Sequence, residues 1–248
     1  MTHAVVLVTG ATSGIGYATA LAFGREGARL VCSGRNAAAG AKLVAELREL
    51  GAEADFVPAD VSNEAQVRQL VEHAVKRFGG LDVAVNSAGT EGTPGSIVNQ
   101  TVESYCATFE ANVLGTFLSM KHELGVMLPQ KRGVVINLSS TMGSRGNGQN
   151  PMYVASKHAI EGLTKAAAIE AGPSNVRVNA VAPGPIDTVM LDRIAGSAER
   201  IAAVAATIPA GRIGTPEEVA DAIVFLASER ASYISGQILG VNGGKTAM

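Results

Sequence analysis

The chain has 248 residues, enough for one large α/β domain and too many for a miniprotein held together by disulfides. Its net charge is −2 at pH 7, and it has no dense basic run, which argues against nucleic acid or an anionic membrane as a partner. Apolar residues make up 47% of the chain and charged residues 17%, a balance that excludes a disordered protein. We expect a compact fold with a small-molecule partner.

The sequence has no segment that predicts insertion into a membrane or export. Charged residues or glycines interrupt the apolar stretches well before the roughly 18 residues of a spanning helix, and the start is not a basic-then-apolar leader. Cys32 and Cys106 lie far apart in apolar segments, which is typical of reduced, buried thiols. The four histidines show no metal-ligand spacing. These features predict a cytoplasmic protein without a metal site.

Seven short apolar segments resemble strands, separated by stretches long enough for crossover helices: 4–9, 29–33, 54–58, 81–86, 133–139, 176–182 and 237–242. They are apolar throughout, which is typical of strands covered on both faces. Asn36, Asn63 and Thr215 have the position and chemistry of helix N-caps. No linker of biased composition divides the chain. The pattern predicts one Rossmann-type domain over residues 1–248, a doubly wound seven-stranded parallel sheet with helices on both faces.

A glycine-rich turn follows the first expected strand and precedes an amphipathic helix, with the pattern TGxxxGxG at 9–16. Glycine allows the backbone to turn tightly there, and amide groups at a helix N-terminus can then approach a pyrophosphate. The alternative is a structural strand-to-helix turn without a ligand. In this context we expect a dinucleotide site that uses Gly10, Thr12, Ser13, Gly14, Ile15 and Gly16.

The end of the second expected strand indicates which dinucleotide is bound. An acidic residue there would accept hydrogen bonds from an unphosphorylated ribose, but the stretch 33–36 reads Ser-Gly-Arg-Asn. The guanidinium of Arg35 suits a 2′-phosphate. The sequence therefore favours NADP over NAD, with a solvated loop arginine as the alternative.

A tyrosine and a lysine stand four residues apart at Tyr153 and Lys157, so they share one face of a helix. Tyrosine has a reference pKa of about 10, and an adjacent ammonium would lower it by stabilising the phenolate. Ser140 follows the fifth expected strand, at the sheet edge where ligands of such folds bind. Its hydroxyl can hydrogen-bond a substrate oxygen.

Taken together, these motifs closely resemble the short-chain dehydrogenase/reductase family in its single-domain form of about 250 residues. The resemblance covers the whole chain and includes TGxxxGxG at 9–16, Asp60-Val61, NSAG at 86–89, Asn112, Ser140 with Tyr153 and Lys157, and Pro183-Gly184 with Thr188. The family's usual NNAG reads NSAG here. The resemblance implies a catalytic tetrad of Asn112, Ser140, Tyr153 and Lys157.

The family also implies a role for each member of the tetrad. Tyr153 is the acid/base, and Ser140 orients the carbonyl. Lys157 holds the nicotinamide ribose and lowers the tyrosine pKa, while Asn112 orders a water linked to Lys157. By itself, Asn112 could equally be a buried polar group of a helix.

Further cofactor contacts follow from the same resemblance. It places Asp60 and Val61 beside the adenine, Asn86, Ala88 and Gly89 along the adenosine, and Ile186 and Thr188, after Pro183-Gly184, at the carboxamide. Tyr153 and Lys157 also touch the cofactor. Without the other motifs, Asp60 would be interpreted as an ordinary turn acid.

The resulting functional hypothesis is an NADP-dependent carbonyl reductase or alcohol dehydrogenase acting on a small molecule. The alternatives are an NAD-dependent alcohol or sugar dehydrogenase, a 3-oxoacyl reductase, and a non-catalytic nucleotide-binding protein. Segment 188–209 is expected to form a lid over an apolar site, opposite the loop 90–96. Family members of this size are usually tetramers, so we expect a homotetramer joined by paired helices and by the strand 237–242.

Overall fold

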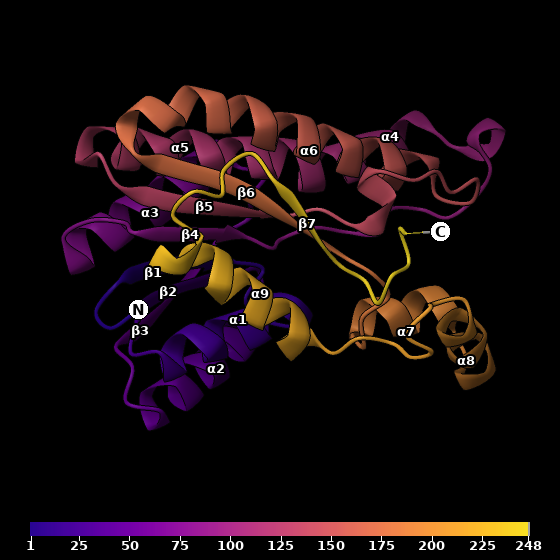
Figure 1. Cartoon of the computed structure of the whole chain (residues 1–248), viewed down its shortest axis with the longest axis horizontal. Helices are drawn as coiled ribbons and strands as arrows, with labels where there is room; N and C mark the ends of the chain where they lie inside the picture. The colour runs from indigo at the N-terminus through magenta and orange to yellow at the C-terminus, as the bar shows by residue number, and fades with distance from the viewer. Residues whose placement is uncertain (248) are drawn as a thin grey trace.

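The computed structural model describes residues 1–247, and its seven strands form one parallel sheet in the order β3-β2-β1-β4-β5-β6-β7 (Figure 1). The strands are β1 (Val5–Thr9), β2 (Arg29–Gly34), β3 (Ala54–Pro58), β4 (Val83–Asn86), β5 (Gly133–Leu138), β6 (Val176–Pro183) and β7 (Ile238–Val241). The expected doubly wound sheet is confirmed, and each strand begins and ends within two residues of its expected limits.

Helices cover both faces of the sheet. They are α1 (Gly14–Arg25), α2 (Ala37–Glu49), α3 (Glu64–Phe78), α4 (Val102–Phe109), α5 (Gly115–Gln130), α6 (Pro151–Ala171), α7 (Val189–Ala195), α8 (Ala198–Ala206) and α9 (Pro216–Ala227). Figure 1 shows α1, α2 and α9 on one side of the sheet and α5 and α6 on the other. The expected three-layer arrangement follows.

Strand β1 shows why the strands are apolar throughout. Val6 and Val8 pack into the core cluster that contains Phe23 of α1. Val5 and Leu7 point the other way, into the cluster that contains Leu70 of α3 and Met127 of α5. Because successive side chains of a strand alternate between faces, a strand covered on both faces needs apolar residues at every position.

Polar side chains begin the helices where the sequence indicates. The side chains of Asn36 and Asn63 accept hydrogen bonds from backbone amides in the first turns of α2 and α3. Thr215 forms a reciprocal capping box with Glu218 at the start of α9. Such caps satisfy amides that a helix leaves without intrahelical partners.

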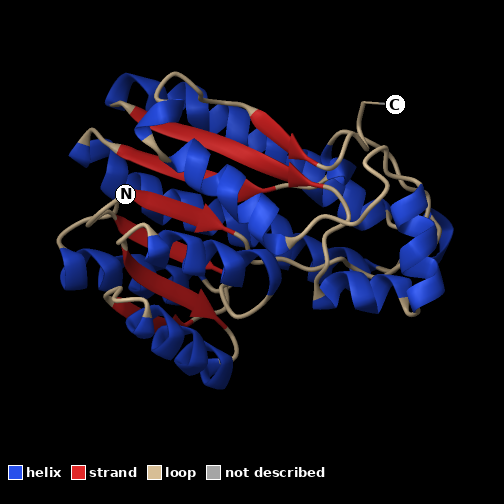
Figure 2. Cartoon of the chain, turned by 60° about the horizontal axis from the view of Figure 1, so that its bottom comes forward, coloured by secondary structure: helices blue, strands red, loops and turns tan. Residues whose placement is uncertain are grey.

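The strand order produces a crevice between β1 and β4. The chain runs outward from β1 to β3, returns to β4 on the other side of β1, and continues outward to β7. In parallel sheets of this kind, ligands bind at the carboxyl ends of the strands where the order reverses. The strand arrows in Figure 2 point toward this edge, on the side where α7 and α8 lie.

Other expectations concern metals, membranes and thiols. Within residues 1–247 no group of three or more His, Cys, Asp and Glu side chains could hold a metal ion, and no helix there is long and apolar enough to cross a membrane. Cys32 is fully buried in β2. Cys106 is only partly buried, contrary to expectation, because the apolar run around it forms α4 in the outer layer, with Tyr105 partly exposed.

Candidate active site

A cleft of about 560 Å³ opens at the carboxyl edge of the sheet, at the crevice between β1 and β4. It is lined by eleven of the residues expected to contact the cofactor: Gly10, Thr12, Ser13, Gly14, Ile15, Arg35, Asp60, Val61, Ala88, Gly89 and Thr188. Segments far apart in the sequence therefore meet around one volume.

Glycine is required at two points where the turn lines the cleft. Gly10 has a φ of +67°, and a Cβ there would lie 2.7 Å from the backbone nitrogen of Ala88. Gly14, with a φ of +54°, begins α1 and faces the side chain of Thr188. The bare backbone leaves the amides of the first turn of α1 accessible from the cleft, as a pyrophosphate requires.

Gly16 has a different place from the other two. It is buried within α1 and is absent from the cleft wall, and a Cβ there would overlap the carbonyl oxygen of Gly10. The structure thus places this residue behind the turn, where it packs α1 against the chain leaving β1.

Arg35 enters the cleft just beyond β2. Asp60, on the cleft wall after β3, accepts hydrogen bonds from the amide and hydroxyl of Ser62, and these bonds lower the pKa of Asp60. Asp60 therefore stabilises its own turn as well as lining the cleft. No acidic residue follows β2 directly. The glycine turn and the volume of the cleft fit a dinucleotide.

Tyr153 and Lys157 occupy one face of α6 as expected. The Lys157 Nζ lies 5.5 Å from the centre of the Tyr153 ring and donates a hydrogen bond to the carbonyl oxygen of Leu138 at 2.7 Å. Burial lowers the pKa of Lys157 to about 8. The ammonium is thus placed between the end of β5 and the tyrosine.

The pKa of Tyr153 is raised, in contrast to the expected lowering by Lys157. Burial is the largest cause, because it disfavours the phenolate, and the negative charge of Glu91 adds to it. A hydrogen bond with the Ser140 side chain acts in the opposite direction. Ser139, the neighbouring hydroxyl, instead donates to Glu161 at 2.8 Å in the interior. Of the two serines, Ser140 is therefore the one whose side chain acts on the pKa of Tyr153.

Asn112 lies in a single π-helical turn, Glu110–Leu114, between α4 and α5. Its Nδ2 donates to the Ser156 hydroxyl at 3.0 Å and to the carbonyl oxygen of Thr90, and its Oδ1 accepts from the Thr90 amide at 2.8 Å. These bonds join the turn after β4 to α6, one residue before Lys157. Such turns are rare and occur frequently at functional sites.

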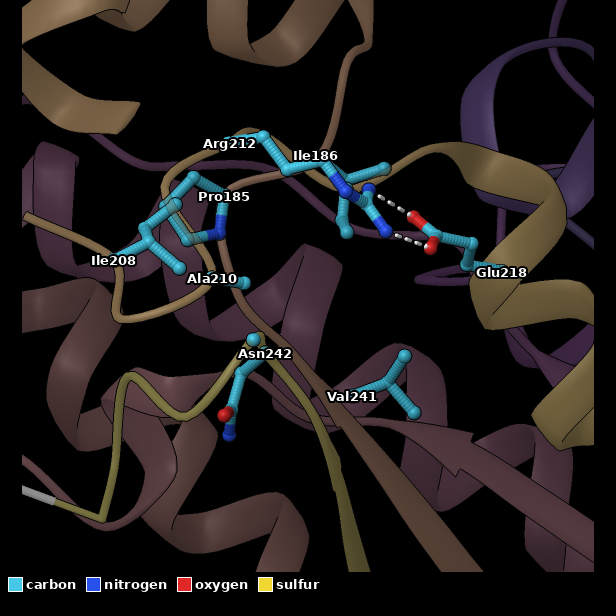
Figure 3. Close-up of a pocket in the computed structure, with 10 residues that line it drawn as sticks. Pro185, Ile186, Ile208, Ala210, Arg212, Glu218, Val241 and Asn242 are labelled. Atoms are coloured by element: carbon cyan, nitrogen blue, oxygen red, sulfur yellow. Dashed lines mark hydrogen bonds and ion pairs between the residues drawn. The ribbon is translucent and has the colours of Figure 1, made fainter. Parts of the chain in front are cut away.

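Six further expected contacts are absent from the cleft wall: Tyr153 and Lys157 of α6, Asn86, Pro183, Gly184 and Ile186. Asn86 is buried at the end of β4, where its Nδ2 donates to Glu123 and to Asn137, both at 3.0 Å. Pro183 ends β6, and Gly184 follows it beside Asn242. Ile186 lines a separate cavity of about 90 Å³, with Pro185, Ile208 and the Arg212–Glu218 ion pair around it (Figure 3).

The segment expected to form a lid contains α7 and α8. Val189, Met190 and Arg193 of α7 line the cleft, and Arg193 forms an ion pair with Glu91 in the loop after β4. The sequence reasoning missed Arg193, Glu91 and the small wall residues Ala107 and Ala111. Alanines at helical spacing give no distinctive signal in an alanine-rich chain, and the Glu91–Arg193 partners lie 102 positions apart.

Comparisons with known proteins agree with this geometry. Residues 10–246 match the family described as enoyl-(acyl carrier protein) reductase. The chain is 39% identical to 3-oxoacyl-(acyl-carrier-protein) reductase FabG of Thermotoga maritima, over 97% of this chain and 96% of the relative. The structure of levodione reductase superposes with a TM-score of 0.97 at 34% identity, covering 100% of this chain and 99% of the other. The structure of a variant of actinorhodin polyketide ketoreductase with NADPH superposes with a TM-score of 0.95 at 35% identity, covering 100% of each chain.

Proposed function

Because the chain belongs to the short-chain dehydrogenase/reductase family, and is an NAD(P)-dependent oxidoreductase of ketones and alcohols, we propose that NADP is its cofactor and Tyr153 its catalytic acid/base. Ser140, Lys157 and Asn112 complete the catalytic set. The main support is the position of Lys157, whose buried ammonium lies 5.5 Å from the centre of the Tyr153 ring, together with the Ser140 side chain, which acts on the Tyr153 hydroxyl.

Each residue has a distinct part in this mechanism. The Ser140 hydroxyl donates to the substrate oxygen and holds it beside the Tyr153 hydroxyl, which gives up its proton during reduction and takes one during oxidation. When bound, the nicotinamide supplies or accepts the hydride. Lys157 places a positive charge near the phenolate formed on reduction. Asn112 keeps the turn after β4 fixed against α6 through Thr90 and Ser156.

The choice of NADP rests on Arg35. Its guanidinium lies on the cleft wall, and no carboxylate directly follows β2 to repel a phosphate. A planar guanidinium can bind a 2′-phosphate through two parallel hydrogen bonds. The ketoreductase neighbour with NADPH supports the same choice.

A 3-oxoacyl thioester is the second candidate substrate. The name of the Thermotoga maritima relative favours it, and the description of the matched family shares only the acyl-carrier-protein part of such a substrate. Levodione reductase favours a free cyclic ketone. The apolar side chains that α7 contributes to the cleft, Val189 and Met190, suit either.

A turnover panel tests the proposal. Purified protein is assayed with NADPH and with NADH against a simple ketone, a cyclic diketone, a steroid ketone, a keto sugar and an acetoacetyl thioester. The readout is kcat/KM, followed by the absorbance of the reduced cofactor. We expect reduction of at least one class with a higher kcat/KM for NADPH. Preference for NADH would contradict the cofactor assignment. Tight NADPH binding without turnover on any class would favour a nucleotide-binding protein.

We further propose that the single domain works as a homotetramer in the cytoplasm. Apolar side chains are exposed on the helices of one layer, namely Val102 and Tyr105 on α4, Phe117 on α5 and Ile169 on α6. Strand β7 ends the sheet with an unpaired edge. Sedimentation at micromolar concentration is expected to give four times the chain mass, and a mass of one chain would contradict the tetramer.

A further inference from the structure

Two hydrogen bonds fix the chain that leaves β5 against α6. The carbonyl oxygen of Leu138 accepts from the Lys157 Nζ at 2.7 Å. The hydroxyl of the next residue, Ser139, donates to Oε1 of Glu161 at 2.8 Å. Glu161 stands four residues after Lys157 and eight after Tyr153, so the three side chains lie along one face of α6. The helix that carries the tyrosine and the lysine therefore also presents a carboxyl group to the end of β5.

The Ser139–Glu161 bond is an interior contact. Only 7% of Glu161 and 4% of Ser139 is exposed. An interior acceptor that loses its donor keeps the cost of its desolvation, which favours the bonded arrangement. The amide of Ser139 also donates to the carbonyl oxygen of Val181 in β6 at 2.8 Å. Ser139 is thus fixed through its backbone to the sheet and through its side chain to α6.

The next residue, Ser140, begins a short 3-10 turn, η3 (Thr141–Gly143). Its hydroxyl oxygen accepts a hydrogen bond from the amide of Met142 at 3.2 Å, and its carbonyl oxygen accepts from the amide of Gly143 at 2.9 Å. A hydroxyl can accept and donate at the same time, so the bond from Met142 leaves the Ser140 proton available for a substrate oxygen. The place of that proton donor depends on where η3 lies.

The far end of η3 lies against the same carboxyl group. A Cβ on Gly143 would overlap Oε1 of Glu161 and would lie 2.5 Å from the hydroxyl oxygen of Ser139. Only glycine leaves room for this close approach. Glu161 therefore contacts the chain on both sides of Ser140, one residue before it and three residues after it.

We propose that Glu161 is a positioning residue for the reaction, which keeps the Ser140 hydroxyl in place beside Tyr153 by fixing the chain around Ser140 to α6. The inference rests on the proposed roles of Ser140 and Tyr153. Because Tyr153 and Glu161 belong to one helix, the acid/base and the donor to the substrate oxygen keep a constant separation. Misplacement of a reacting group by about 1 Å can cost on the order of 10²-fold in rate, which is the loss that Glu161 prevents.

The test compares Glu161→Leu, Glu161→Gln and Ser139→Ala with the wild type. Leucine is a good helix former but cannot accept a hydrogen bond, whereas glutamine keeps an oxygen acceptor. Ser139→Ala removes only the donor, and it carries the test if Glu161→Leu does not fold. Glu72→Leu on the exposed surface of α3 is the matched control. Each protein is measured for its melting temperature, for the Kd of NADPH, and for kcat and KM with the substrate identified in the turnover panel.

Glu161→Leu and Ser139→Ala should lower kcat by about tenfold to 10²-fold, more than they raise KM. The reason is that Ser140 donates to an oxygen on which negative charge develops during hydride transfer, so its misplacement costs most in the transition state. The Kd of NADPH should stay within about twofold of the wild-type value. Glu161→Gln should restore most of the lost kcat, and Glu72→Leu should leave kcat unchanged.

A double variant shows whether Glu161 acts through Ser140. In a Ser140→Ala protein, Glu161→Leu should lower kcat by a further factor of less than about two, because no hydroxyl is left to misplace. A full tenfold further fall in that protein would overturn the proposal, and so would wild-type kcat in Glu161→Leu or an equal loss in Glu161→Gln.

Ser140→Ala alone separates failure of this inference from failure of the proposed function. If Ser140→Ala loses most of its turnover while Glu161→Leu and Ser139→Ala keep theirs, the positioning role of Glu161 alone is wrong. If Ser140→Ala keeps wild-type turnover, the role assigned to Ser140 is wrong, and the positioning role falls with it.

Discussion

The carbonyl oxygen of Gly10 occupies the place that a Cβ on Gly16 would need, so α1 packs directly against the chain leaving β1. The third glycine of the motif therefore acts at a distance from the ligand. It determines how close the first turn of α1 can come to the sheet. The position of the amides that face the cleft depends on that packing.

Replacement of this glycine should damage both the fold and the cofactor site. Gly16→Ala would force backbone atoms apart, and overpacking of this kind costs about 1–3 kcal/mol. We expect a lower melting temperature and at least tenfold weaker NADPH binding, measured by thermal unfolding and by fluorescence titration. Gly125→Ala in α5 is the control, because a Cβ there meets nothing within 4 Å. Equal behaviour of the two variants would contradict the packing argument.

The cofactor assignment predicts that Arg35→Asp reverses nucleotide preference. The change removes a charge-assisted contact, worth roughly 1.5–3 kcal/mol, and adds repulsion toward a 2′-phosphate. The kcat/KM for NADH should fall less than that for NADPH, or even rise, because the new carboxylate can accept a hydrogen bond from a free ribose hydroxyl. The readout is the ratio of kcat/KM for NADPH and NADH. Arg25→Asp at the end of α1 makes the same change of charge and serves as the control. If Arg35→Asp leaves the ratio of kcat/KM unchanged, Arg35 is a solvated loop residue that does not bind the cofactor.

A buried carboxyl group should make stability depend on pH. Glu123 is fully buried against Asn86, and burial raises its pKa to about 7. Between about pH 4.5 and pH 7, the folded protein keeps the Glu123 carboxyl protonated, whereas the unfolded chain releases that proton. The free energy of unfolding therefore falls progressively as the pH rises through this range. This destabilisation is absent below about pH 4.5 and complete above about pH 7.

Glu123→Gln should remove this dependence. The free energy of unfolding of the variant, relative to that of the wild type, should rise by on the order of 3 kcal/mol from pH 4.5 to pH 7. Urea unfolding across this range provides the measurement. Glu72→Gln, an exposed residue of α3, serves as the control with little expected change. A difference between Glu123→Gln and the wild type that does not vary with pH would show that the carboxyl titrates normally.

Most of the fold could be predicted because its signals are local. Strands buried on both faces are apolar at every position, and Asn36, Asn63 and Thr215 cap helices wherever they stand before an amphipathic run. The alternation of apolar strands with stretches long enough for crossover helices then predicts the doubly wound parallel sheet. The glycine turn and Arg35 could be placed in the cleft because each follows a predicted strand directly.

The remaining features depend on tertiary contacts that a sequence pattern does not contain. The direction of the Tyr153 pKa shift is set by burial, which spacing to Lys157 does not indicate. Asn112 acts from a π-helical turn, whose extra residue has no simple periodic signature. Ile186 follows a motif residue closely but its side chain lies in a second cavity. The Glu91–Arg193 pair joins the loop after β4 to the helix α7, and the two segments have unrelated sequences.

The most direct test of the central claim is Tyr153→Phe, which removes one hydroxyl from α6 and leaves the cleft wall intact. Measurement combines kcat for the substrate identified in the turnover panel with the Kd of NADPH, and Tyr233→Phe at the exposed surface is the control. We predict an NADPH Kd close to that of the wild type and a fall in kcat of about 10²-fold or more, because the proton path is lost. Near-normal kcat in Tyr153→Phe would contradict the account.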